Sequence, residues 1–206
     1  MTHPDEEMGR PNQPQRLIEQ ARLGDQGAQQ ELWQAHRRWV AAIILAHRPQ
    51  SVEVDDLMQD VALKFVAKVP TLRDAGAFRP WLRQIVLNVC RGEARNLRPT
   101  LRIAQGDASD DNRIEPGRVA QPQSHDAIAD DIIDTNDAAK RLMAQVLTLP
   151  PEYREPLLLR CVRSLTYQQI SDILDLPVTT IETRLARARR MLRAEVGDEV
   201  CLEEGA

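Results

Sequence analysis

Two helix-capping motifs, thirteen residues apart, constrain the fold of this chain more than any other feature. Thr166-Tyr167-Gln168-Gln169 and Thr179-Thr180-Ile181-Glu182 both have the Ser/Thr-x-x-Glu/Gln spacing in which two side chains satisfy free backbone N–H groups at a helix start. Leu176-Pro177 ends the first helix, because a residue that precedes proline disfavours the helical conformation. Two short helices joined by a tight turn form a helix-turn-helix, which we predict over residues 166–193.

The second of these helices combines an apolar stripe with a free polar face. The stripe consists of Ile181, Leu185, Ala188 and Leu192, spaced i, i+4, i+7 and i+11. The remaining surface carries hydroxyl and guanidinium groups, which bond base edges or phosphates in a DNA major groove. A simple solvated charged face is the alternative for such a run. The predicted DNA-binding residues are Thr179, Thr180, Thr183, Arg184, Arg187 and Arg190.

The net charge of −4 conceals a strong separation of charge along the chain. Residues 79–102 contain six arginines and a single acid, Glu93, and residues 184–193 contain five arginines and no acid. Residues 105–135 between them carry eight acids and only two arginines. Because phosphate binding needs local positive charge, the two basic segments are candidate nucleic-acid contacts.

Composition and periodicity favour an all-α fold. Aromatic residues make up only 3% of the 206 residues and there are nine glycines, whereas 42% hydrophobic residues allow a packed core. Helical periodicity predicts one or two helices up to Arg48-Pro49 and further helices over 55–69, 80–97, 137–147 and after Pro151. Trp81 shares the apolar stripe of its helix, which favours a core role over base stacking.

We therefore predict two small helical domains joined by a flexible acidic linker. The predicted parts are a disordered tail over 1–14, an N-terminal domain over 15–98, the linker over 99–135, a C-terminal helix-turn-helix domain over 136–197 and an acidic tail over 198–206.

The cysteines and the N-terminus give no sign of a cofactor or a membrane segment. Cys90, Cys161 and Cys201 form no CxxC pair and have no histidine at ligand spacing, so we predict free thiols and neither metal nor other cofactor. Residues 1–15 lack an apolar signal region, and no run of about 18 apolar residues occurs. We expect a cytoplasmic protein without membrane insertion.

Both halves of the chain also carry motifs of one protein family. In the C-terminal half these are Leu149-Pro150, Leu165–Ile170 and Val178–Arg189, and in the N-terminal half Val54–Val61 and Phe78–Asn88. In this order they resemble the extracytoplasmic-function (ECF) sigma factors of the sigma-70 family. The family has glycine where Thr179 stands and often lysine where Glu182 stands. The resemblance implies a transcription initiation factor that has no catalytic centre and directs RNA polymerase to promoters.

The resemblance also implies a role for each domain. The C-terminal helix-turn-helix would read the promoter −35 element, and the N-terminal domain would capture the unpaired −10 strand. For the −10 strand, Asn88 matches a family position, and Arg83, Arg91, Arg95 and Arg98 offer phosphate contacts. The implied polymerase-binding residues are Asp56, Leu57, Gln59 and Asp60. The implied partners are the clamp helices and flap of core RNA polymerase, promoter DNA and an anti-sigma factor.

Two other classes of function remain as alternatives. A stand-alone helix-turn-helix regulator would bind paired half-sites as a dimer, without polymerase. A metal-dependent nuclease would need carboxylates such as Asp55, Asp56 and Asp60 as ligands, but these share one helix start and no histidine or second carboxylate cluster accompanies them. The nuclease has the weaker support.

Overall fold

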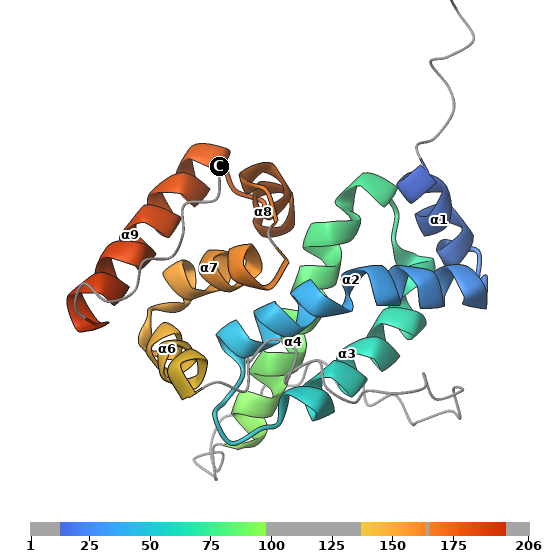
Figure 1. Ribbon diagram of the computed structural model, residues 1–206. Helices are drawn as coiled ribbons and strands as arrows, with labels where there is room; N and C mark the ends of the chain where they lie inside the picture. The colour runs from blue at the N-terminus through green and yellow to red at the C-terminus, as the bar shows by residue number, and fades with distance from the viewer. Residues whose placement is uncertain (1–12, 98–136, 164, 197–206) are drawn as a thin grey trace, which may run out of the picture.

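The structure, a computed structural model, describes residues 13–97, 137–163 and 165–196. Every element in this part of the chain is a helix, which confirms the all-α prediction (Figure 1). The N-terminal domain comprises α1 (Gln13–Arg22), α2 (Gln26–His47), α3 (Val54–Lys68) and α4 (Phe78–Asn96), with short 3-10 turns at Val69–Thr71 and Ala75–Ala77. The C-terminal domain comprises α6 (Asp137–Thr148), α7 (Pro151–Arg163), α8 (Tyr167–Leu174) and α9 (Val178–Val196).

The opening segment folds as two helices because Gly24 and Asp25 interrupt it. Gly24 has a φ of +92°, a conformation that glycine adopts without steric cost. The Asp25 carboxylate then accepts a 2.8 Å hydrogen bond from the Ala28 N–H and caps α2. At the other end of α2, Arg48 is extended, with a ψ of 149°, as expected before Pro49.

An aromatic cluster fills the core where α2, α3 and α4 meet. The Phe65 ring lies 6.0 Å from Trp33 and 6.3 Å from Phe78, measured between ring centroids. Trp81 lies 6.3 Å from Phe65 and 6.0 Å from Phe78. Trp81 therefore packs against the core, as its place on the apolar stripe predicts.

The first capping motif forms as predicted, but the second does not. Thr166 caps α8 and makes the full reciprocal box with Gln169. Helix α9 begins at Val178, so Thr179 already lies inside its first turn and cannot be the residue that precedes the helix. Pro177 is the residue before the helix, and its carbonyl accepts the first backbone bonds of α9, from the N–H groups of Thr180 and Ile181. The predicted second capping box is therefore wrong.

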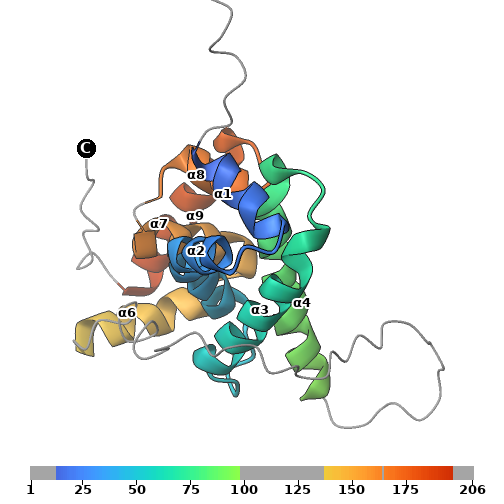
Figure 2. The same ribbon diagram turned by 90° about the vertical axis from the view of Figure 1, so that its right-hand side faces the viewer.

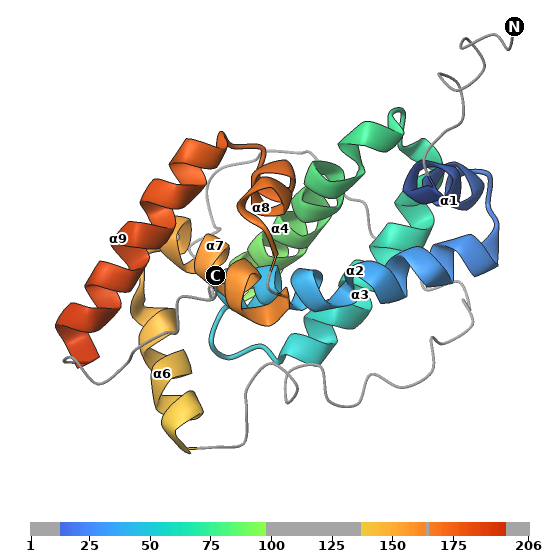
Figure 3. The same ribbon diagram turned by 45° about the horizontal axis from the view of Figure 1, so that its top comes forward.

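The two domains pack directly against each other. Helix α7 lies between α9 and α2 and contacts both, and α8 contacts α4 (Figures 1 and 3). Viewed along α2, α3 and α4 lie on one side of this helix and α7 on the other (Figure 2). The sequence predicts the two domains, but no sequence pattern predicts that they pack against each other.

Candidate nucleic-acid interface

The turn between α8 and α9 has the geometry of a helix-turn-helix. The Thr166 hydroxyl accepts from the Gln169 N–H at 3.2 Å, and the Gln169 side chain accepts from the Thr166 N–H at 2.9 Å. Helix α8 ends at Leu174 and is followed by Asp175, whose φ of 55° is left-handed, a conformation that aspartate tolerates better than most residues. The Leu176 N–H then donates to the Ser171 carbonyl at 3.2 Å and closes the turn.

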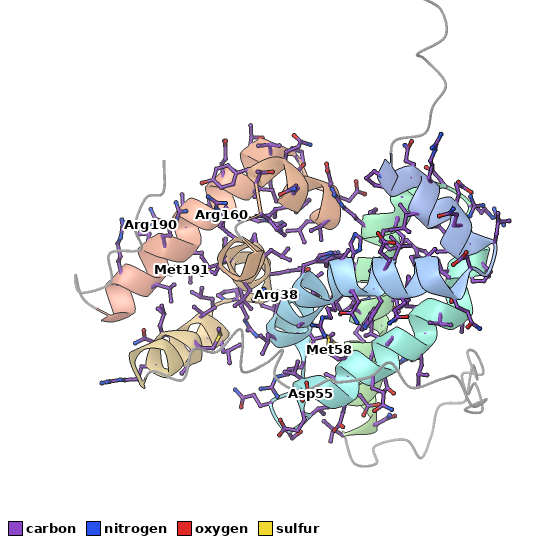
Figure 4. The ribbon with its side chains drawn as sticks, turned by 45° about the vertical axis from the view of Figure 1, so that its right-hand side comes forward. Arg38, Asp55, Met58, Arg160, Arg190 and Met191 are labelled. Atoms are coloured by element: carbon purple, nitrogen blue, oxygen red, sulfur yellow. The ribbon has the colours of Figure 1, made fainter. Side chains whose placement is uncertain are left out.

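Helix α9 presents the predicted recognition residues on its accessible side. Its apolar stripe is buried, with exposed fractions of 0% for Ile181, 1% for Leu185 and 5% for Leu192. Of the six predicted DNA-binding residues, two are half-buried, Thr180 and Arg184. The other four are exposed, namely Thr179, Thr183, Arg187 and Arg190. Figure 4 shows Arg190 on α9, well separated from the start of α3, where Asp55 lies.

A hollow of about 380 Å³ lies where α7 meets the start of α9. Its lining consists of Glu152, Tyr153, Thr179, Thr180, Thr183, Arg184 and Arg187. Five of these seven were predicted from the sequence as DNA-binding residues. Glu152 and Tyr153 come from α7 and were missed, because their position beside α9 is set by the packing of α7 against α9 and has no local sequence signal.

Helix α4 carries a second exposed polar stripe. Gln84, Asn88, Arg91 and Arg95 are spaced i, i+4, i+7 and i+11, and all four are exposed. The Gln84 amide donates a 3.0 Å hydrogen bond to the Asn88 side chain, which orients the amide of Asn88. Gln84 was missed from the sequence, although its spacing to Asn88 places it on the same stripe. Arg98 lies outside the described residues.

Arg83 does not belong to this stripe, because it is bound to a residue of the C-terminal domain. Its Nε and Nη2 donate to the two carboxylate oxygens of Glu155 on α7, at 2.7 and 2.8 Å. The structure therefore brings together Asn88, Arg91 and Arg95 on one exposed stripe, whereas Arg83 faces the C-terminal domain.

The first part of α3 forms an exposed acidic surface. Asp56, Gln59 and Asp60 are exposed on one face. Desolvation raises the pKa of Asp60, and the Glu93 and Asp56 carboxylates also raise it, against the lowering effect of Lys64. Leu57 instead lies in the core, only 1% exposed, because it is one helical turn before the buried Val61.

Leu63 is the apolar residue that joins this surface. It is 40% exposed and lies one turn after Asp60, on the face of Asp56 and Gln59. We call Asp56, Gln59, Asp60 and Leu63 the α3 surface.

The part of the chain that the structure describes contains no group of three or more metal-ligating side chains. Within the same residues, none of the helices combines the length and the apolar character needed to cross a bilayer.

Comparison with known proteins places both domains in one family. The family model "Sigma-70 region 2" matches residues 32–100, and "Sigma-70, region 4" matches residues 139–192. The ECF RNA polymerase sigma-E factor of Escherichia coli (strain K12) is 27% identical over 182 residues, which cover 87% of this chain and 92% of that protein. The ECF RNA polymerase sigma factor SigW of Bacillus subtilis (strain 168) is 21% identical over 181 residues, covering 88% and 95%.

The fold also occurs among solved structures. The structure of CnrH in complex with the cytosolic domain of CnrY aligns with a TM-score of 0.58 at 21% identity, covering 92% of this chain and 100% of that chain.

Proposed function

This chain belongs to the sigma-70 family as a sigma factor of the ECF type, which directs RNA polymerase to promoters, and we propose that its two domains read two separate promoter elements. The C-terminal domain, over 136–197, would bind the −35 element, and the N-terminal domain, over 15–98, would bind the −10 element. Residues 99–135 would serve as the tether between them. The observation that carries this proposal is the pair of exposed arginine-bearing faces, one on each domain.

The proposed −35 contact is the accessible side of α9 together with the hollow beside it. Arg187 lines this hollow with Thr183, and arginine bonds a guanine edge through two N–H groups. The Thr183 hydroxyl donates to the Thr179 carbonyl at 2.8 Å, so its proton is used and its oxygen can act only as an acceptor toward DNA. Thr180, Arg184 and Arg190 would contact phosphates or flanking bases.

The proposed −10 contact is the exposed stripe of α4. Asn88 and its hydrogen-bonded neighbour Gln84 offer amide groups for an unpaired base, while Arg91 and Arg95 offer charge to the backbone of the single strand. The aromatic rings of this domain are packed in its core, so we propose that strand capture depends on hydrogen bonds and charge.

The α3 surface is the proposed contact with the clamp helices of core RNA polymerase. Asp56, Gln59 and Asp60 are exposed on this face and Leu63 continues it by one turn, so the surface combines polar groups with an apolar side chain, as protein interfaces do. The flap of the polymerase would receive the C-terminal domain. We propose that the protein acts by binding alone, without catalysis of its own, and in the cytoplasm where polymerase and promoters are found.

A second protein partner follows by analogy. CnrH, which shares this fold, was solved in complex with the cytosolic domain of CnrY. We propose that this chain also binds a second protein, an anti-sigma factor that holds it until it is released to the polymerase. Affinity capture with the full chain as bait, followed by reconstitution of transcription inhibition with the captured protein, tests this point.

Run-off transcription tests the main proposal. Core RNA polymerase and the protein are incubated with a library of genomic fragments, and a promoter selected in this way then serves in gel-shift assays with and without polymerase. We expect specific binding only with polymerase, because each domain alone binds weakly and the tether joins the two contacts. Tight specific binding without polymerase would favour the stand-alone regulator instead.

Variants of the α3 surface separate polymerase binding from DNA binding. The double change Asp56→Ala with Gln59→Ala should reduce co-purification with core polymerase several-fold, while Glu31→Ala, an exposed acid on α2, should leave it unchanged. Full retention by the double variant would show that the polymerase binds elsewhere.

A further inference from the structure

The most deeply buried charge described between the two domains is the carboxylate of Glu155. This α7 residue is only 4% exposed, yet its hydrogen-bonding partners both belong to the N-terminal domain. Arg83 of α4 donates to both carboxylate oxygens, at 2.7 and 2.8 Å, in the bidentate geometry that gives the strongest arginine–carboxylate pairs. His47, the last residue of α2, places its Nε2 3.0 Å from Oε2 of the same carboxylate.

These partners keep Glu155 ionised despite its burial. Desolvation by itself would raise the pKa of this carboxyl, but the hydrogen bonds and positive charge of Arg83 and His47 outweigh it and hold the pKa below its usual range. A buried carboxylate that loses such partners is strongly disfavoured. The contact is therefore specific to this arrangement of the two domains.

The neighbouring residues reinforce the same contact. Arg154 donates through Nη1 to the Ala46 carbonyl at 2.9 Å, and through Nε and Nη2 to Leu149 of its own domain. Ala46 lies in the last turn of α2, where the backbone carbonyls lack partners within the helix. Arg154 therefore ties α7 to the end of α2.

The end of α2 is also apolar on every side. Its residues from Trp39 to Ala46 are all buried, with none more than 4% exposed. A helix with buried residues all round needs neighbours on all faces. Helix α7 covers the face of α2 that α3 and α4 leave uncovered (Figure 2). Charged and apolar contacts thus act together to keep the domains closed.

This closed arrangement is incompatible with the proposed reading of two promoter elements. The −35 and −10 elements lie about 25 base pairs apart, or roughly 85 Å along a duplex at 3.4 Å per base pair. A compact chain of this length has a radius of gyration of about 17 Å, which corresponds to a diameter of about 45 Å. The domains must separate to reach both elements, and the stretch of about 40 residues between α4 and α6 has a contour length of up to about 130 Å.

The side chain of Arg83 can likewise bind either Glu155 or DNA, but not both in the same way. Both of its hydrogen-bonded nitrogens are directed at Glu155, so its guanidinium cannot at the same time hold a promoter phosphate with those groups. Glu155 occupies Arg83 much as a phosphate would, as a bidentate anion.

We propose that Glu155 is an intrachain latch, which holds the free protein closed by occupying Arg83 and His47 and is released when the protein engages RNA polymerase. The release of the latch on polymerase rests on the proposed function, whereas the closed state rests only on the contacts of Glu155. Opening returns Glu155, Arg83 and His47 to water, where each can be solvated, so that the latch can act reversibly.

Charge reversal combined with a distance measurement tests the latch. Spin labels on unnatural amino acids replace the exposed Asp55 on α3 and Arg190 on α9, the positions labelled in Figure 4, so that the native cysteines remain. Pulsed electron resonance of the wild-type background should give one narrow distance distribution. Glu155→Arg should give a longer and broader one, because two cations then face each other. Adding Arg83→Glu to it should restore the narrow distribution.

Glu152→Gln is the matched control, because it neutralises an exposed acid on the same helix, and it should leave the distances unchanged. Circular dichroism verifies that each variant retains its helices. A broad distribution in the wild type, or an unchanged one in Glu155→Arg, would overturn the latch. Failure of the double variant to restore the narrow distribution would also overturn it, since the pair itself would then not be responsible.

Competition for limiting core polymerase tests the release step. The apparent Kd of a protein falls as the fraction already in the competent state rises, so Glu155→Arg should outcompete the wild-type chain several-fold. Equal competition would show that closure does not oppose polymerase engagement. If the distances respond as expected but the unlabelled wild-type chain does not support transcription, the latch stands and the proposed promoter reading fails.

Discussion

Helices α4 and α9 both carry rows of arginines, but the C-terminal domain covers part of α4 and leaves the outer side of α9 open. On α4, Arg79 and Arg83 are bound to acids of α8 and α7. On α9, Arg187 and Arg190 are exposed to solvent. The local sequences are similar in charge, so the difference arises from what each helix packs against. A row of arginines therefore indicates where an anion can bind, while the fold decides which anion it is.

The largest expected effect concerns the covered side of α4. Cys90 lies seven residues after Arg83, on the same side of the helix, and is 2% exposed. Desolvation raises the pKa of the Cys90 thiol from 9.0 to about 11. A backbone hydrogen bond lowers this pKa, and the nearby charge of Glu155 raises it further. At pH 8 its thiolate fraction is therefore about 100-fold below that of an unperturbed thiol.

We expect Cys90 to react with iodoacetamide at least about 100-fold more slowly in the folded protein than in denaturant. Mass spectrometry of the peptides after timed quenching measures this rate separately for each cysteine. Cys161 provides the internal comparison, because it is exposed; desolvation raises the pKa of its thiol as well, but the charges of Arg189 and Arg160 oppose that rise. If Cys90 reacted in the folded protein as fast as it does in denaturant, the covered side of α4 would be open in solution, and the contrast with α9 would disappear.

The open side of α9 predicts the next effect. Arg187→Ala should lower specific run-off transcription about tenfold, since loss of one bidentate base contact costs about 1.4 kcal/mol within the usual range for such pairs. Co-purification with core polymerase should not change. Arg193→Ala, which removes an exposed arginine farther along α9, is the control. Unchanged transcription with Arg187→Ala would mean that the exposed face of α9 is only a solvated surface.

The sequence predicts much of this contrast, but only within each helix. The spacing of Ile181 and Leu185 identifies the buried side of α9, and the Thr166–Gln169 capping box identifies the start of α8. Both are local patterns, in which each residue acts on its near neighbours. The second capping motif failed because α9 already begins at Val178, directly after Pro177, and residue type alone does not reveal this start.

Contacts between distant segments could not be predicted in the same way. Glu155 is 72 residues from Arg83, and a lone glutamate in a helix is most often a solvated residue. Leu57 was placed on the polymerase surface by resemblance, whereas its spacing to Val61 correctly marks it as a core residue. Tyr153 reaches the hollow beside α9 only through the packing of α7. Each of these positions depends on how the helices are arranged in space.

The exposed stripe of α4 predicts a smaller effect that depends on salt. The measured quantity is the slope of log affinity against log salt for binding of the polymerase complex to a single-stranded −10 sequence. Arg91→Ala with Arg95→Ala should reduce the magnitude of this slope by about 1.4, because each lost phosphate contact removes about 0.7. Filter binding over a range of salt concentrations gives the slope. Arg73→Ala, an exposed arginine outside α4, should leave it unchanged. An unaltered slope in the double variant would remove the stripe from the DNA interface.

The smallest effect is expected at the second ion pair between the domains. Arg79 lies 3.0 Å from Asp172, but the two side chains are 41% and 43% exposed, so solvent screens the pair and it contributes less than about 1 kcal/mol. Asp172→Asn should therefore leave the distance between the spin-labelled domains unchanged and shift the free energy of unfolding in urea by less than about 1 kcal/mol. Gln168, which donates to the other oxygen of Asp172 at 3.0 Å, retains an acceptor in this variant. If Asp172→Asn opened the domains as widely as Glu155→Arg, α8 and not α7 would hold the covered side of α4. The burial of Glu155 would then have no special role, and exposure would not distinguish the ion pair of Arg79 from that of Arg83.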